Sequence, residues 1–83
     1  DASERLYAIF NVILKVEPQN SRIIGRRALL CRKMGLDKEA LADLKRYFSF
    51  VDRSQAPAEM VVAFQELTGR TDSMRAHSGE LLH

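Results

Sequence analysis

This chain of 83 residues has little of several residue types that small proteins use for stability or chemistry. It has one cysteine, two histidines and no tryptophan. The single cysteine, Cys31, excludes an internal disulfide and predicts the cytoplasm or another reducing intracellular compartment. A membrane span needs about 20 consecutive apolar residues, and runs such as Val12–Leu14 are far shorter. The composition therefore favours a small domain that has neither a disulfide scaffold nor a membrane segment.

The chain also lacks a strong charge of either sign. Its net charge of +2 is too small to indicate nucleic-acid binding by itself. It begins at Asp1 and shows no signal-peptide pattern, so we expect it to be a piece of a longer protein. A hydrophobic share of 46% is ordinary for a globular chain. At this length the core is close to the lower limit for independent stability, and we expect a single domain.

Apolar residues recur at helical spacing in four segments, which predicts an all-α fold. The first helix is expected over about 3–16, with its apolar residues at Leu6, Ile9, Phe10, Ile13 and Leu14. The second is expected over about 21–34, the third from 37 to about 51 and the fourth from 57 to 69. The expected N-caps are Ser3, Asn20 or Ser21, and Asp37, and the expected stops are Pro18, Gly35 and Gly69.

The third helix has the clearest periodicity in the chain. Its apolar face consists of Ala40, Leu41, Leu44, Tyr47, Phe48 and Val51. Its outer, polar face is expected to consist of Lys38, Glu39, Asp43, Lys45 and Arg46. The methyl group of Ala40 lets two helices approach closely. A loop of two or three residues at Gly35 forces the second and third helices into an antiparallel hairpin.

The composition turns polar after Gly69. We therefore predict a helical domain over 1–69 and a polar C-terminal extension over 70–83. The extension is either a frayed tail or a short helix that begins near Asp72, and we favour the helix.

The hairpin over 21–52 resembles a tetratricopeptide repeat. It runs Ile24-x2-Arg27-Ala28-x2-Cys31, then Ala40-x3-Leu44, then Asp52, and Pro18 lies one period of about 34 residues before Asp52. Over roughly 4–68 the chain is similar to the repeat segment that follows the transglutaminase-like domain in SirB-like bacterial proteins. The matching residues are Arg27, Gly35, Ala40, Asp43, Leu44 and Tyr47.

The resemblance implies a short array of stacked antiparallel hairpins, about four helices plus the extension. Any transglutaminase-like fold would lie upstream, and nothing in these residues would carry its chemistry. Three positions depart from the repeat pattern. Ala28 occupies a position where these repeats favour glycine, Arg27 one where they favour leucine, and Asp52 one where they favour proline. The loss of that proline softens the boundary between the third and fourth helices. Stacked hairpins generally present a groove to a partner, so the expected function is non-catalytic protein–protein interaction.

The candidate binding residues are Arg22, Arg26, Leu29 and Lys33. Their spacing places them on one side of the second helix, which lines the inner wall of such repeats. Arg22 and Arg26 are four residues apart, and paired guanidinium groups can bind carboxylates in a bidentate manner. The expected partner is a protein or peptide whose acidic groups the basic residues would recognise, or another domain of the parent chain, and self-association stays open. The simpler alternative is a solvated basic face.

A second alternative is nucleic-acid binding through the basic cluster Arg22, Arg26, Arg27, Arg32 and Lys33. We consider it the weaker one, because the cluster lacks interleaved aromatic residues and any recognition signature. We predict no catalytic residues, because Cys31 occupies an apolar helical position and both histidines lie in the tail. We also predict no metal site and no cofactor.

Overall fold

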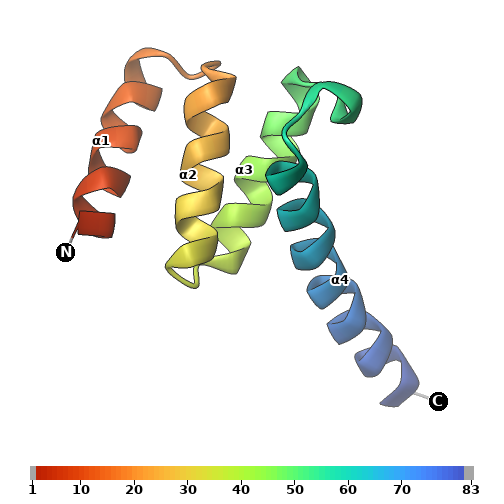
Figure 1. Ribbon diagram of the computed structural model, residues 1–83. Coiled ribbons are helices and arrows are strands. Elements are labelled where there is room, and N and C mark those ends of the chain that lie inside the picture. Colours follow the sequence, from red (N-terminus) through yellow and green to blue (C-terminus); the bar gives the residue numbers. More distant parts are fainter. Residues whose placement is uncertain (1, 82–83) are drawn as a thin grey trace.

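The fold is all-α, as the periodicity predicts. A computed structural model describes the backbone of residues 2–81 and the side chains of residues 2–69. The helices are α1 (Ala2–Val16), α2 (Ser21–Lys33), α3 (Asp37–Phe50) and α4 (Ala58–Leu81), with a short 3-10 turn, η1 (Arg53–Gln55), before α4. Successive helices lie side by side and alternate in direction, and the C-terminal half of α4 extends past the other three (Figure 1).

The α2–α3 hairpin is closed by hydrogen bonds that satisfy the end of α2. Gly35 has a φ of 80°, a conformation that glycine adopts without steric cost. Its amide donates to the carbonyl of Arg32 at 3.2 Å, and the amide of Leu36 donates to the carbonyl of Cys31 at 2.8 Å. These two bonds form a Schellman motif, and Leu36 packs against the core. The structure thus confirms Gly35 as the helix stop and the short antiparallel connection.

The N-caps that the sequence predicts are only partly confirmed by the observed helix starts. Asn20 caps α2, because its side-chain oxygen accepts a hydrogen bond from the amide of Ile23 at 3.2 Å. The other two N-cap predictions are wrong. Ser3 lies inside α1, which begins at Ala2, and Asp37 is the first residue of α3. Leu36 occupies the cap position of α3, because the Schellman motif and its apolar contact already fix the chain there.

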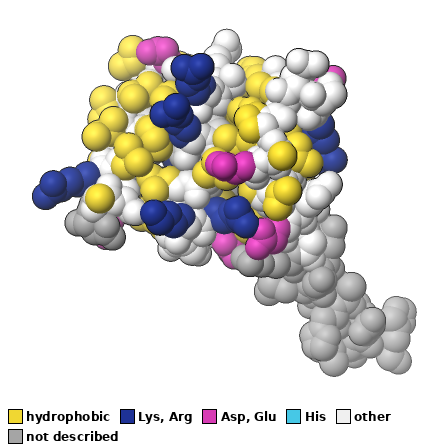
Figure 2. All heavy atoms as spheres, in the orientation of Figure 1, with side chains coloured by type: hydrophobic (Ala, Val, Ile, Leu, Met, Phe, Trp, Pro, Cys, Tyr) yellow, Lys and Arg dark blue, Asp and Glu magenta, His cyan; other side chains and the backbone are white. Residues whose placement is uncertain are grey.

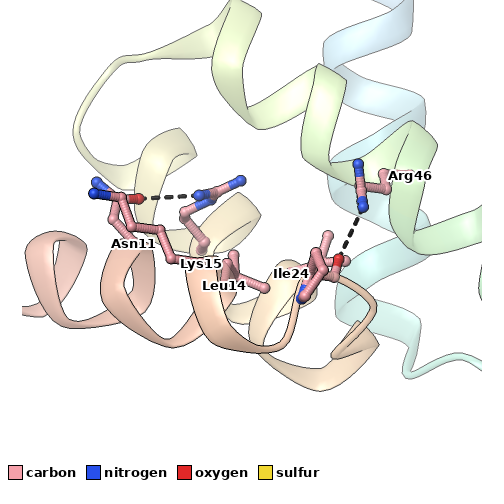
Figure 3. A pocket seen from close by; sticks show the side chains of 7 residues that line it. Asn11, Leu14, Lys15, Ile24 and Arg46 are labelled. Carbon is pink, nitrogen blue, oxygen red and sulfur yellow. Dashed lines mark hydrogen bonds between the residues drawn. The ribbon is translucent and has the colours of Figure 1, made fainter.

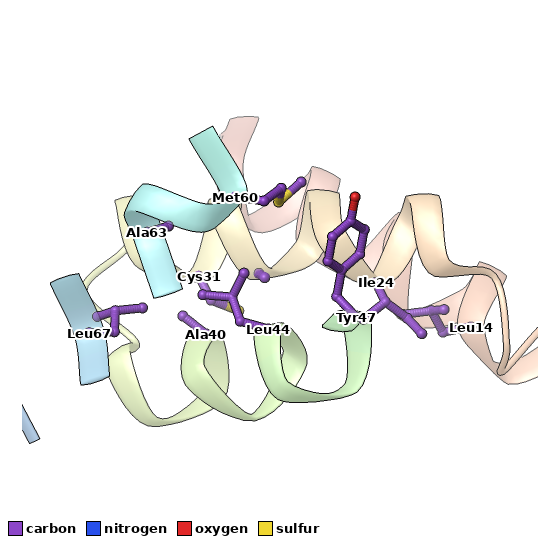
Figure 4. Close-up of a cluster of buried hydrophobic side chains, with 10 residues drawn as sticks. Leu14, Ile24, Cys31, Ala40, Leu44, Tyr47, Met60, Ala63 and Leu67 are labelled. Atoms are coloured by element: carbon purple, nitrogen blue, oxygen red, sulfur yellow. The ribbon is translucent and has the colours of Figure 1, made fainter. Parts of the chain in front are cut away.

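The core forms where α2, α3 and α4 meet (Figure 4). Its largest fully buried side chains are Ile24, Cys31, Leu44 and Leu67. Between them lie alanines that are 0% exposed, namely Ala28, Ala40 and Ala63, one from each helix. Side chains this small allow the helix backbones to approach closely, as expected for Ala40.

The first helix is only half covered. Phe10 and Leu14 are buried, and α1 packs mainly on α2. Four large apolar side chains of α1 are exposed: Leu6, Ile9, Val12 and Val16. Hydrophobic side chains are accordingly gathered over α1 on the face that Figure 2 shows. The apolar pattern of this segment therefore marks a core contact on one side and an exposed surface on the other.

Asp43 does not lie on the outer face of α3, and that prediction is wrong. It is buried, with 7% of its surface exposed, and it accepts two hydrogen bonds from Arg27 of α2. Arg27 Nε lies 2.8 Å from Asp43 Oδ2, and Arg27 Nη2 lies 2.8 Å from Asp43 Oδ1. Arg27 Nη1 also donates to the side-chain oxygen of Asn11 at 3.0 Å, which links α1 to the hairpin. The hydrogen-bonded Asp43 carboxylate raises the pKa of Arg27.

The expected stop at Gly69 is also wrong. Helix α4 continues through Gly69 to Leu81 without a break, so no separate helix begins near Asp72. A glycine inside a helix costs only about 1 kcal/mol relative to alanine, so it does not by itself end a helix. Gly35 ends α2 because hydrogen bonds and an apolar contact hold its left-handed conformation. The side chains of the predicted extension beyond Gly69 lie outside the described residues.

Candidate functional site

The four predicted binding residues share one side of α2. Arg22, Arg26 and Lys33 are exposed, and Leu29 is half-buried against the core. At about 100° of rotation per residue, their offsets of four, seven and eleven residues fall within an arc of about 60°. We call this surface the α2 face. Its charged groups reach solvent while Leu29 stays attached to the core.

No carboxylate among the side chains of residues 2–69 forms an ion pair with the cations of the α2 face. Helix α2 contains five basic residues, of which Arg27 pairs with Asp43 and Arg32 pairs with Glu66. Among the described side chains, none forms a hydrogen bond or ion pair with the remaining three, which are Arg22, Arg26 and Lys33. Basic side chains are spread along α2 in Figure 2, and acidic ones lie beside them toward α4. Within α2, the positive charge that is available to a ligand therefore lies on the α2 face.

A hollow of about 410 Å³ lies beside the C-terminal end of this face, between α2 and α4. It is lined by Leu29, Arg32, Lys33, Glu59 and Glu66. The Arg32–Glu66 ion pair joins the two helices across it. The hollow thus has basic groups on its α2 side and acidic groups on its α4 side.

The four predicted binding residues therefore fall into two groups relative to the hollow. Leu29 and Lys33 line the hollow, whereas Arg22 and Arg26 lie outside it, closer to the start of α2. Sequence reasoning missed Glu59 and Glu66 as part of this surface. Their spacing of seven residues places them on one side of α4, but only the packing of α4 against α2 brings that side to the hollow.

Cys31 is a core residue, as expected. It is 0% exposed, and burial raises the pKa of its thiol to about 11, with the carboxylate of Asp43 acting in the same direction. At neutral pH it is therefore a protonated thiol and a poor nucleophile. In the part of the chain that the structure describes, no three His, Cys, Asp or Glu residues form a group that could hold a metal ion. None of the described helices combines the length and apolar character that crossing a membrane demands.

The chain has no match among the family models, the curated proteins or the solved structures with which it was compared. The resemblance to tetratricopeptide repeats thus stays a prediction that rests on the residues quoted above.

Proposed function

We propose that this chain is a non-catalytic docking module, built on the tetratricopeptide plan, that binds an acidic segment of a partner protein along the α2 face. One observation carries the proposal: three cations, Arg22, Arg26 and Lys33, stand without a described partner on one side of one helix. Leu29 lies on the same side and offers an apolar contact between them. A protein segment with carboxylates next to an apolar residue complements this surface.

The binding strength follows from the exposure of these groups. Each exposed ion pair contributes about 0.2–1 kcal/mol, and burial of one aliphatic side chain against Leu29 contributes about 1.5–3 kcal/mol. Before the cost of lost translational and rotational freedom is subtracted, the total is only comparable to the roughly 4 kcal/mol that corresponds to a millimolar dissociation constant. An isolated peptide should therefore bind weakly, and binding should weaken further with salt. A tethered partner, such as another domain of the parent chain, would gain effective concentration.

The neighbouring hollow sets the direction of the bound segment. Glu66 is paired with Arg32, whereas Glu59 repels additional carboxylates near the Lys33 end of the α2 face. The acidic residues of the partner therefore lie over Arg22 and Arg26, and its neutral or basic residues lie beside α4. This charge order distinguishes the docking surface from a uniformly basic patch.

The ion pairs that α2 forms with α3 and α4 favour a protein over a nucleic acid as partner. The basic cluster loses two of its five cations to ion pairs with Asp43 and Glu66. Helix α2 contains no aromatic residue on which a base could stack. The exposed apolar side of α1 adds a second surface for a partner protein, and self-association through it stays open.

The test is a fluorescence-anisotropy titration with a labelled peptide that has an acidic half, a central leucine and a lysine-containing half. Arg22→Glu/Arg26→Glu should abolish binding without loss of helicity. The matched control is Lys38→Glu/Lys45→Glu, which makes the same charge change on exposed positions of α3. An equal loss of binding in both variants would contradict the proposal, because it would show attraction to net charge alone. A fall in helicity in the first variant only would assign the two arginines a structural role.

A further inference from the structure

A second hollow, of about 420 Å³, lies where α1, α2 and α3 meet. Its lining residues are Asn11, Leu14, Lys15, Pro18, Ile24, Arg27 and Arg46. None of them belongs to the α2 face, and none is acidic. The volume is close to the lower end of the roughly 300–1,000 Å³ that small-molecule pockets occupy.

The hollow carries a net positive charge. Arg27 adds none, because Asp43 neutralises it through two hydrogen bonds. Arg46 Nη2 donates to the carbonyl oxygen of Pro18 at 2.8 Å, which fixes its guanidinium over the α1–α2 loop. Lys15 is exposed and has no partner among the described side chains. Two uncompensated positive charges, those of Lys15 and Arg46, therefore border the hollow.

These charges lie at opposite ends of the hollow. Asn11 and Lys15 are at one end, Arg46 is at the other, and the apolar side chains of Leu14 and Ile24 lie between them (Figure 3). The oxygen of the Asn11 amide accepts a hydrogen bond from Arg27, so its NH2 group is turned away from that contact. Asn11 and Lys15 thus carry hydrogen-bond donors at one end of the hollow, and the Arg46 guanidinium lies at the other.

We propose that this hollow binds a small organic dianion of the linear dicarboxylate class. One carboxylate is held by Lys15 and the Asn11 amide, and the other by Arg46. The aliphatic part of the ligand packs on Leu14 and Ile24. A monocarboxylate or inorganic phosphate has a single anionic centre, so we expect it to engage only one of the two ends. Length selectivity among dicarboxylates is therefore the signature of the site.

The experiment is a titration of the whole chain, followed by amide chemical shifts, with linear dicarboxylates of increasing length. Monocarboxylates of equal length and inorganic phosphate serve as comparison ligands. The dicarboxylate of one particular length should bind about tenfold or more tightly than the matched monocarboxylate. The reason is that the monocarboxylate lacks the charged hydrogen bonds at one end of the hollow. Its shifts should be confined to the surroundings of Asn11, Lys15 and Arg46. Equal affinity for phosphate, no dependence on length or no saturable shifts would each overturn the proposal.

Variants separate this site from general attraction to positive charge. Lys15→Gln should weaken the selected dicarboxylate about tenfold, because Lys15 makes no described contact that folding needs. Lys45→Gln is the matched control, since it removes one exposed charge next to Arg46 but outside the hollow. Equal weakening in both variants would refute the site. Arg22→Glu/Arg26→Glu should leave the length selectivity among dicarboxylates intact, so failure of the docking proposal and failure of this one are distinguishable.

Discussion

Replacement of Asp43 by alanine tests the ion pair that joins the two helices of the central hairpin. In the native chain, Arg27 donates to both carboxylate oxygens of Asp43 and to the side-chain oxygen of Asn11. Asp43→Ala removes two of these three acceptors. The guanidinium then keeps its charge in a site that solvent reaches only in part.

The expected cost follows from the burial of the two partners. Removal of one member of a fully buried ion pair costs about 3–5 kcal/mol. The Arg27 side chain is 24% exposed and that of Asp43 is 9% exposed. Because water can still reach part of Arg27, we expect a smaller loss of about 2–3 kcal/mol. A domain of 83 residues has a total stability of about 4–12 kcal/mol, so the loss is a large fraction of it.

Urea unfolding followed by circular dichroism measures this loss, provided that the dependence on denaturant stays unchanged. Asp43→Asn, which keeps one acceptor, should fall between the native chain and Asp43→Ala. The double variant Arg27→Met/Asp43→Leu should recover most of the stability, because it removes the buried charge together with its partner. A loss below about 0.5 kcal/mol for Asp43→Ala, which is typical of exposed positions, would refute the reasoning.

Three further substitutions test the core. Ala40→Leu should overfill the contact around a position that is 0% exposed and destabilise the fold by about 1–3 kcal/mol, and an unchanged melting temperature would argue against this packing. In Gly25→Ala, the new Cβ would lie 2.8 Å from Met60 Cε and 2.9 Å from Tyr47 Cε1, so overpacking should outweigh the gain in helix propensity of about 1 kcal/mol and lower the melting temperature. For Cys31, burial raises the thiol pKa from 9.0 to about 11, so the thiol loses its proton at a lower pH in the unfolded chain than in the folded one. The free energy of unfolding of the native chain should therefore decrease as the pH rises from 9 to about 11. That of the Cys31→Ala variant should decrease less over the same range. Parallel pH profiles of the two chains would contradict that assignment.

Local signals in the sequence were sufficient to predict the hairpin and the fold class. Gly35 followed by Leu36 indicates a Schellman stop, and Asn20 before an apolar repeat indicates a cap. Both depend on residues a few positions apart, so a pattern along the chain can detect them. The small residue at Ala40 likewise predicted a close helix contact at a position that proved to be wholly buried.

The errors do not share one physical cause, because Asp43 is buried by a tertiary contact, whereas Ser3, Asp37 and Gly69 concern local helix ends. Asp43 looks like a surface residue in a helical pattern, since nothing local shows that Arg27, sixteen residues earlier, reaches it. Ser3 and Asp37 are good capping residues, but the helices begin at Ala2 and at Asp37 itself. Gly69 resembles a stop, but it lacks the bonds that hold Gly35.

The candidate binding surfaces could likewise be predicted from the sequence only in part. Helical spacing alone placed Arg22, Arg26 and Lys33 on one exposed side of α2. It could not bring Glu59 and Glu66 opposite that side, because they belong to a helix reached through an irregular connector. A hollow bordered by groups from three helices could not be foreseen, because no repeat in the sequence relates those groups.

The most direct test of the docking proposal is a map of amide chemical-shift changes as the half-acidic peptide is titrated into the isotope-labelled chain. We predict saturable changes along Arg22, Arg26, Leu29 and Lys33, with the acidic half of a spin-labelled peptide nearest to Arg22. The changes should disappear in the Arg22→Glu/Arg26→Glu variant and persist in the Lys38→Glu/Lys45→Glu control. Changes centred on the exposed apolar side of α1, or spread evenly over all basic residues, would contradict the assignment of the α2 face as the docking surface.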